Sequence, residues 1–181
     1  MPQILHRARF ETPVGAMVAL SSGAGLCALE FDSPSRQKLL AARLEEWIAG
    51  YRLEHMSDAV EASISRWLTA YFHREFPVPP PLDLRGSLFE VTVWKALLAI
   101  PAAKTTTYGG LALTLGIPGS ARAVGSAVRR NPISLIVPCH RVVGSDGALR
   151  GYGGGVSQKR WLLEHEMGRP GVARGPWGPP S

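Results

Sequence analysis

The sequence predicts an α+β protein in two parts, a small strand-and-helix domain followed by a mainly helical one. Three observations predict this arrangement. Short apolar runs separated by turn residues fill the first 31 positions, helical spacing dominates the rest, and a proline-rich segment at 76–82 separates the two halves. A length of 181 residues allows one large or two small domains. Apolar residues make up 45% of the chain and are spread along it, which excludes disorder over most of its length.

The first elements are expected to be antiparallel strands. Apolar runs at 3–5, 16–20 and 26–31 alternate with turn sequences at 12–15 and 21–25. The glycine-rich residues 23–28 superficially match a dinucleotide-binding loop, but a strand-like run follows them where that loop requires a helix. We therefore interpret them as a hairpin turn.

Two amphipathic helices are expected next, at 35–51 and 57–75. The first places Leu39, Leu40, Leu44 and Ile48 on one face and has Ser33 or Ser35 as its cap. The prolines at 76–82 exclude helix and central strand. We therefore expect domains at 1–80 and 81–168, and a disordered tail at 169–181, where glycine and proline are dense.

The second domain begins with a predicted helix at 89–100, which Pro101 ends. Its apolar residues recur at helical spacing and are expected in the core: Phe89, Val93, Trp94, Leu97 and Leu98. Two shorter helices, 107–115 and 120–130, flank a four-residue turn that contains glycine, which is typical of a helix-turn-helix.

The second of these short helices has a capping serine, Ser120, and ends at Asn131-Pro132. Its predicted inward stripe is Ala121, Val124, Gly125 and Val128. Its predicted outward residues are Arg122, Ser126, Arg129 and Arg130. An ordinary helix pair with a solvated basic face is the alternative interpretation.

The charge is uneven along the chain. Residues 1–87 carry 9 basic and 10 acidic side chains, whereas 88–181 carry 11 and 4. Such an excess suggests a polyanionic partner, with an inert basic surface as the alternative.

No apolar run reaches the roughly 18 residues that span a bilayer, and no long apolar block follows the charged first residues. Two cysteines are too few for a disulfide scaffold or a four-ligand zinc site. We expect a reducing compartment, the cytoplasm, or the nucleus in a eukaryote.

The chemistry centres on Cys139. Residues 133–137 suit a buried strand, and Pro138 ends it directly before the thiol. A cysteine in apolar surroundings has a raised pKa and is inert without a nearby base or positive charge, which His140 could supply. Because neighbouring side chains on an extended chain point in opposite directions, the backbone must bend after Pro138 or a water must relay the proton.

A third member of the site follows from helical spacing. A helix at 157–167, closed by Gly168, places Leu162, Leu163 and Glu166 on one face. A carboxylate on an inward stripe needs a partner, and His140 is the one we expect. Cys139, His140 and Glu166 would then be nucleophile, base and orienting group. The alternative is a buried thiol, a surface histidine and a solvated glutamate.

The glycine-rich residues 147–155 lie between the thiol and this helix. They lack the lysine and hydroxyl residue of a phosphate-binding loop. Glycines at this density favour close approach of backbone amides to a flat ligand, with Tyr152 stacked over it, while a flexible loop is the alternative.

These residues carry a resemblance to a known family. The run 138–143 (Pro-Cys-His-Arg-Val-Val), preceded by Asn131-Pro132 and followed by Gly151-Tyr152-x-Gly-Gly, resembles the active-site signature of O6-alkylguanine-DNA alkyltransferases, also called methylated-DNA–protein-cysteine methyltransferases. The resemblance extends over roughly 87–168, through the runs 93–98, 107–108, 121–125 and 161–166. It implies a ribonuclease-H-like first domain and a helix-turn-helix that binds the DNA minor groove.

The resemblance also implies the reaction. The protein would flip O6-alkylguanine, or O4-alkylthymine, out of double-stranded DNA and transfer the alkyl group irreversibly to Cys139, once per molecule. The catalytic set would be Cys139, His140, Glu166, Asn131 and Tyr108. The residues that contact DNA or the flipped base would be Arg122, Ala121, Gly125, Ser145, Tyr152, Gly153, Gly154 and Phe89. No cofactor, metal or membrane is implied, and the protein is expected to act as a monomer, with Cys27 as buried filler.

Three other functions stay open at this point. A non-catalytic, alkyltransferase-like protein would bind the lesion without repairing it, but such relatives lack the reactive cysteine. A transcription regulator could use the same helix-turn-helix, although it would leave the thiol and Glu166 without a purpose. A Cys-His hydrolase would turn over repeatedly and would ignore DNA.

Overall fold

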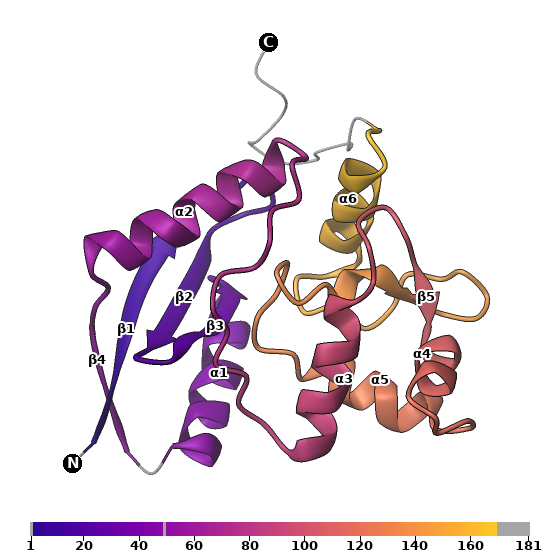
Figure 1. The fold of residues 1–181 in the computed structure, drawn as a ribbon, viewed down its shortest axis with the longest axis horizontal. Coiled ribbons are helices and arrows are strands. Elements are labelled where there is room, and N and C mark those ends of the chain that lie inside the picture. The colour runs from indigo at the N-terminus through magenta and orange to yellow at the C-terminus, as the bar shows by residue number, and fades with distance from the viewer. Residues whose placement is uncertain (1, 49, 170–181) are drawn as a thin grey trace. The chain divides into compact units, whose positions relative to one another are not determined.

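The computed structural model describes residues 2–48 and 50–169 and has a mixed α/β fold with six α-helices (Figure 1). The chain divides into two compact units. Unit 1 contains the residues up to Gly86 together with Pro132–Ser134, and unit 2 contains Ser87–Asn131 and the chain from Leu135 onward. Apart from Arg169, the tail predicted to be disordered, 169–181, lies outside the described residues.

Unit 1 is built on a four-stranded sheet in the order β3-β2-β1-β4. Its strands are β1 (Gln3–Phe10), β2 (Met17–Ser22), β3 (Gly25–Phe31) and β4 (Tyr51–His55). The first three are antiparallel, as predicted, and β4 is parallel to β1. Strand β4 was not predicted, because most of its side chains are exposed and it forms by pairing with a strand that is distant in sequence.

Two helices complete unit 1, α1 (Pro34–Trp47) and α2 (Asp58–Phe72). Leu40 and Leu44 of α1 pack with Leu5, Leu20 and Cys27 of the sheet, together with Ala28 and Ile48. Cys27 is thus buried, as expected, and burial raises its pKa to about 12. The prolines that follow α2 stay with this unit, since the Leu26 N–H donates to the Pro81 carbonyl.

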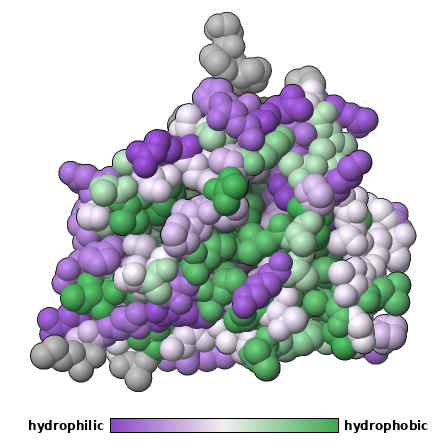
Figure 2. Space-filling model, in the orientation of Figure 1, coloured by the Kyte–Doolittle hydropathy of each residue, from purple (hydrophilic) through white to green (hydrophobic). Residues whose placement is uncertain are grey.

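Unit 2 begins with α3 (Leu88–Leu98), which starts in a capping box formed by Ser87 and Glu90. Its buried stripe is Glu90, Val93, Trp94 and Leu97, and the Trp94 indole donates to the Ala127 carbonyl at 2.8 Å. The prediction that Phe89 lies in the core is wrong: it is 40% exposed, because it falls off this stripe. It is one of several apolar side chains at the surface of unit 2, and Figure 2 shows apolar surface interspersed with polar surface on one face of the molecule.

Two short helices follow, α4 (Tyr108–Thr114) and α5 (Ala121–Arg129), joined by residues 115–120. The Thr107 hydroxyl caps α4 by accepting the Gly110 N–H at 2.9 Å. The predicted inward stripe of α5 is partly wrong. Val124, Ala127 and Val128 are buried, whereas Ala121 and Gly125 are half-buried, and the side chain of Ser120 makes no capping hydrogen bond.

The remaining elements of unit 2 are two short strands, a 3-10 turn and a helix. Strand β5 (Thr106–Thr107) pairs in parallel with β6 (Val142–Val143), directly before Tyr108. A 3-10 turn, η1 (Cys139–Arg141), precedes β6, and the last helix is α6 (Val156–Glu166).

The buried strand predicted at 133–137 is wrong. All five residues are buried, but they form turns, with a single bridge from Ile133 to Leu29 and a left-handed backbone at Leu135 (φ 67°). Their apolar content comes from burial and not from sheet pairing.

Candidate active site

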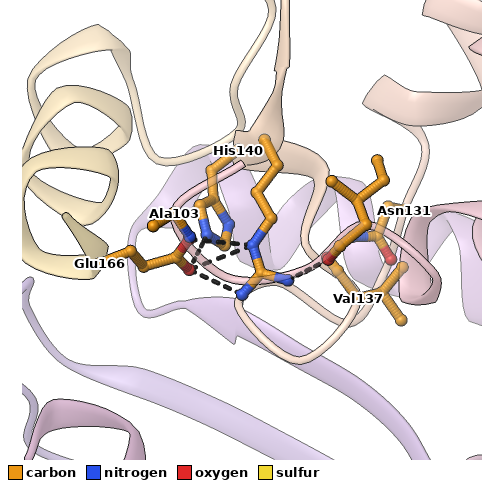
Figure 3. Close-up of polar contacts among 7 residues, drawn as sticks. Ala103, Asn131, Val137, His140 and Glu166 are labelled. Carbon is orange, nitrogen blue, oxygen red and sulfur yellow. Dashed lines mark hydrogen bonds and ion pairs between the residues drawn. The ribbon is translucent and has the colours of Figure 1, made fainter. Parts of the chain in front are cut away.

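Cys139 is the first residue of η1 and is 7% exposed. The bend that the sequence analysis required after Pro138 is this 3-10 turn, closed by hydrogen bonds from the Arg141 N–H to the Pro138 carbonyl (3.0 Å) and from the Val142 N–H to the Cys139 carbonyl. Asn131 holds the approach to the turn, because its Nδ2 donates to the Val137 carbonyl at 2.9 Å (Figure 3). The thiol therefore sits at the start of a constrained turn.

His140 and Glu166 are in contact, with 2.7 Å between Nε2 and Oε1 and both side chains fully buried (Figure 3). Burial would raise the pKa of Glu166, but hydrogen bonds and charge from His140 and Arg141 hold it far below its usual range. Burial lowers the pKa of His140, and the Glu166 carboxylate only partly offsets this. A neutral imidazole beside a carboxylate must donate from Nε2, which puts its basic lone pair on Nδ1.

Arg141 is the part of this cluster that the sequence analysis did not assign. Its Nε lies 3.0 Å from Glu166 Oε2 and its Nη2 lies 2.8 Å from Oε1, while the Ala103 N–H donates to Oε2 at 3.0 Å. A buried carboxylate needs more compensation than one neutral histidine provides. The arginine adjacent to His140 in the sequence was the available signal.

Tyr108 stands at the start of α4 and donates from its hydroxyl to the Arg150 carbonyl at 3.1 Å. Gly151 allows its close packing, because a Cβ there would lie 3.0 Å from the hydroxyl, whereas a Cβ on Gly125 would make an ordinary contact with the ring at 3.4 Å. Burial and the Cys139 thiol raise the pKa of Tyr108, so its hydroxyl stays protonated and remains a donor.

Lys159 is a second group that the sequence analysis missed. It is completely buried and donates to the carbonyls of Val142 and Arg150. Nothing in its helical position distinguishes it from a surface lysine of an amphipathic helix, because the acceptors belong to a loop whose course is not set by local sequence.

The remaining predicted contact residues lie at different depths. Tyr152 is buried, with its ring edge-on to His140 at a centroid distance of 6.2 Å. Gly153 and Gly154 are half-buried, and Ser145 and Arg122 are exposed. The functional roles assigned to all these residues stay predictions.

Among residues 2–48 and 50–169, no three or more His, Cys, Asp or Glu side chains are grouped so that they could hold a metal ion. In the same range, no helix has the length and apolar character needed to cross a membrane.

Comparison with known proteins identifies relatives. Residues 88–168 match a family model described as the DNA-binding domain of 6-O-methylguanine DNA methyltransferase. A methylated-DNA–protein-cysteine methyltransferase of Mycobacterium bovis is 56% identical over 105 residues, which are 56% of this chain and 62% of the relative, so this match spans less than two thirds of that protein. The protein of the same name from Mycobacterium leprae is 39% identical over 166 residues, or 90% of this chain and 93% of the relative.

Solved structures agree with the sequence matches. The crystal structure of Mycobacterium tuberculosis OGT in complex with DNA is 39% identical, with a TM-score of 0.74 over 91% of this chain and 94% of that one. The O6-methylguanine-DNA methyltransferase of the archaeon Pyrococcus kodakaraensis is 30% identical, with a TM-score of 0.65 over 90% and 98% of the two chains. The chain therefore belongs to the methylated-DNA–protein-cysteine methyltransferase family.

Proposed function

We propose that the protein repairs DNA by moving the alkyl group of O6-alkylguanine, or of O4-alkylthymine, onto Cys139 in a single irreversible turnover. The observation that carries this proposal is the Cys139 turn joined directly to the buried His140–Glu166 pair. A thiol adjacent in the chain to a neutral imidazole, one nitrogen of which is held by a carboxylate, suits an activated nucleophile. It acts without a metal, as a monomer, in the compartment that holds the DNA.

The chemical step follows from these groups. His140 takes the Cys139 proton through a water molecule, and the thiolate sulfur attacks the alkyl carbon in line with the C–O6 bond. The new bond is C–S, the broken bond is C–O6, and the departing guanine takes up one proton, which balances the one lost by the thiol. The Tyr108 O–H, which donates to the Arg150 carbonyl in the free protein, exchanges that acceptor for the base and donates to it as negative charge develops there. Water does not cleave the thioether product, so the protein is consumed.

Recognition of DNA is assigned to unit 2. We propose that α4 and α5 act as a helix-turn-helix on the minor groove, with the small residues Ala121 and Gly125 permitting close approach and Arg122 filling the space of the flipped nucleotide. The exposed position of Arg122 on α5 supports this role. Ser145, Tyr152, Gly153 and Gly154 would contact the flipped base, with Phe89 at the edge of the DNA-binding surface. Unit 1 would correspond to the ribonuclease-H-like domain of the family.

The test is a mass measurement on single-turnover product. The full chain is incubated with duplex DNA that carries one O6-methylguanine, digested, and its peptides are weighed. We expect one added methyl group, of about 14 Da, on the peptide that contains Cys139, and none on the peptide that contains Cys27. A Cys139→Ala variant should take up no methyl group but should still bind the duplex.

Each competing function gives a different result in this experiment. A non-catalytic lesion-binding protein binds the duplex and gains no mass. A regulator binds without preference for the lesion, and a hydrolase neither binds nor gains mass. Methyl uptake by Cys139→Ala would disprove the assignment of the nucleophile.

A further inference from the structure

Glu90 is a buried carboxylate of unit 2 that lies outside the cluster around Glu166. It is 8% exposed and belongs to the first turn of α3. Its Oε2 accepts the Ser87 N–H at 2.8 Å and the Ser87 hydroxyl at 2.9 Å, which completes the capping box. Its Oε1 accepts the Nε of Arg130, the residue that ends α5. A capping box needs only the N-terminus of its own helix, so the contact with Arg130 is an additional use of this carboxylate.

Arg130 differs from the other arginines of α5. The sequence predicts that Arg122, Arg129 and Arg130 all face outward. Arg122 and Arg129 are exposed, whereas the Arg130 side chain is 37% exposed and is paired with Glu90. Burial raises the pKa of Glu90, but the hydrogen bonds from Ser87 and the Arg130 guanidinium bring it below its usual range. The charge of Arg130 is therefore balanced inside unit 2.

The Glu90–Arg130 pair joins the start of α3 to the end of α5. A second contact between the same helices lies about one turn away on each, where the Trp94 indole donates to the Ala127 carbonyl at 2.8 Å. The Arg130 N–H donates to this carbonyl as well, at 3.1 Å. Two contacts at different points along a helix resist both sliding and rotation, so the last turn of α5 is fixed against α3.

The end of α5 leads directly to the nucleophile. Asn131 follows Arg130, is 2% exposed, and donates from Nδ2 to the Val137 carbonyl at 2.9 Å. The same carbonyl accepts the Cys139 N–H at 2.8 Å. A displacement of Arg130 therefore moves Asn131 and, through this shared acceptor, the first residue of the Cys139 turn.

We propose that Glu90 and Arg130 form a positioning pair for alkyl transfer, which fixes the end of α5 and thereby the Cys139 turn, and that Arg130 makes no contact with DNA. The inference rests on the proposed function in taking alkyl transfer to Cys139 as the reaction. The effect of the pair on the turn, however, can be measured without DNA.

The test is a double-mutant cycle on single-turnover methyl transfer at saturating duplex. Glu90→Gln keeps an oxygen that can accept the Ser87 N–H but removes the negative charge, and Arg130→Gln removes the positive one. Each variant should react about tenfold more slowly, since a misplacement of about 1 Å far from the chemistry can cost about 10²-fold. The double variant should be no slower than the slower single variant, because the interaction is lost only once. Arg130→Lys keeps a charge that can reach Glu90 and should restore most of the rate.

Matched controls separate this role from charge and from stability. Lys95→Gln removes one exposed positive charge from α3 and should keep the transfer rate. Arg129→Gln should lower the slope of log K against log salt concentration by about 1, whereas Arg130→Gln should leave that slope unchanged. All rates are compared well below the thermal melting transition of every variant, so that a loss of stability alone does not change them.

Hydrogen exchange without DNA reports on the turn itself. In the peptide that contains Cys139, exchange should be several-fold faster in Glu90→Gln and Arg130→Gln than in the unaltered chain, and unchanged in Lys95→Gln. Loss of the pair then loosens the turn before any substrate is bound.

Several results would overturn the proposal. Additive slowing in the double variant would mean that the two residues act separately, and a salt slope lowered by about 1 in Arg130→Gln would mean that Arg130 contacts a phosphate. Arg130→Lys as slow as Arg130→Gln would exclude the ion pair as the cause. If Glu90→Gln does not fold, the comparison of Arg130→Gln with Arg130→Lys decides the question. Failure of the unaltered chain to take up methyl would reject the proposed function, while hydrogen exchange would still test the pair.

Discussion

At the scale of single residues, Glu166 organises the buried polar cluster of unit 2. It accepts hydrogen bonds from His140, from the Arg141 guanidinium and from the Ala103 N–H (Figure 3). A carboxylate with this many charge-assisted bonds stays ionised, and an ionised Glu166 fixes which nitrogen of His140 carries the proton. The basicity of the imidazole therefore depends on a residue 26 positions later in the chain.

Glu166→Gln should reduce both stability and alkyl transfer. The variant leaves the buried Arg141 guanidinium without its carboxylate, and breaking a buried ion pair costs about 3–5 kcal/mol. Loss of the fixed tautomer should slow transfer by about 10²-fold or more, the lower end of general-base contributions. Urea denaturation and the rate of methyl uptake measure the two effects. Glu164→Gln, two residues earlier on α6, is the control and should change stability by less than about 0.5 kcal/mol.

The same cluster predicts destabilisation by acid. The pKa of Glu166 in the folded protein lies below the ordinary glutamate value of 4.5, so its stabilisation is present above pH 4.5 and is lost as the pH falls below that value. The pKa of His140 in the folded protein lies below 6.5, so the unfolded chain takes up that proton first as the pH falls through 6.5. Both effects have the same sign. Urea denaturation should show stability falling from pH 7 to pH 4, and Glu166→Gln should flatten the part below pH 4.5. An increase in stability over this range would contradict the assignment.

At the scale of elements, prediction from sequence succeeded where local signals decide the structure. Helix α3 has a capping serine and an apolar stripe, and it was predicted within two residues at each end. The contact between Glu166 and His140 followed from helical spacing and the need to pair a buried carboxylate. Prediction failed where distant pairing decides: β4 forms only against β1, and 133–137 is buried without becoming a strand. Arg141 was missed because its partner, Glu166, lies 25 positions later in the chain. Lys159 was missed because its partners are backbone carbonyls of a loop, and no side chain in the sequence marks them.

The contact of Gly151 with Tyr108 gives a prediction for the glycine-rich loop. Gly151 has φ 69°, and a Cβ there would lie 3.0 Å from the Tyr108 hydroxyl. Gly151→Ala should cost about 1–2 kcal/mol through left-handed strain and should also displace the hydroxyl from the Arg150 carbonyl, slowing methyl transfer several-fold. Gly50→Ala is the matched control, because Gly50 also has a positive φ (84°) but nothing lies within 4 Å of the added Cβ. It should lose similar stability and keep its transfer rate. Equal rates for the two variants would show that the Tyr108 contact is unimportant.

At the scale of the whole molecule, the chain does not divide at one point. Residues 132–134 belong to unit 1, where the Ser134 N–H and hydroxyl donate to the Leu29 carbonyl and to Glu30, both at 2.8 Å. The sequences on both sides of them belong to unit 2. The prolines place the predicted boundary near residue 80. In the structure, unit 1 continues to Gly86 and also includes Pro132–Ser134. Such a segment is recognisable only from backbone pairing between residues about 100 positions apart.

The charge asymmetry gives the last prediction. Residues 88–181 carry a net +7 and residues 1–87 a net −1, from 11 basic minus 4 acidic and 9 basic minus 10 acidic side chains. If unit 2 binds the duplex, log K falls linearly with log salt concentration, and each lost phosphate contact lowers the slope by about 1. Cys139→Ala protein isolates binding from reaction, and fluorescence anisotropy between 50 and 200 mM salt measures the slope. Adding Arg129→Gln on the exposed face of α5 should reduce the slope by about 1, whereas Lys38→Gln on α1 removes the same charge and should leave it unchanged. A slope that responds equally to both changes would mean that binding follows net charge alone, and the assignment of α5 to the DNA would then be wrong.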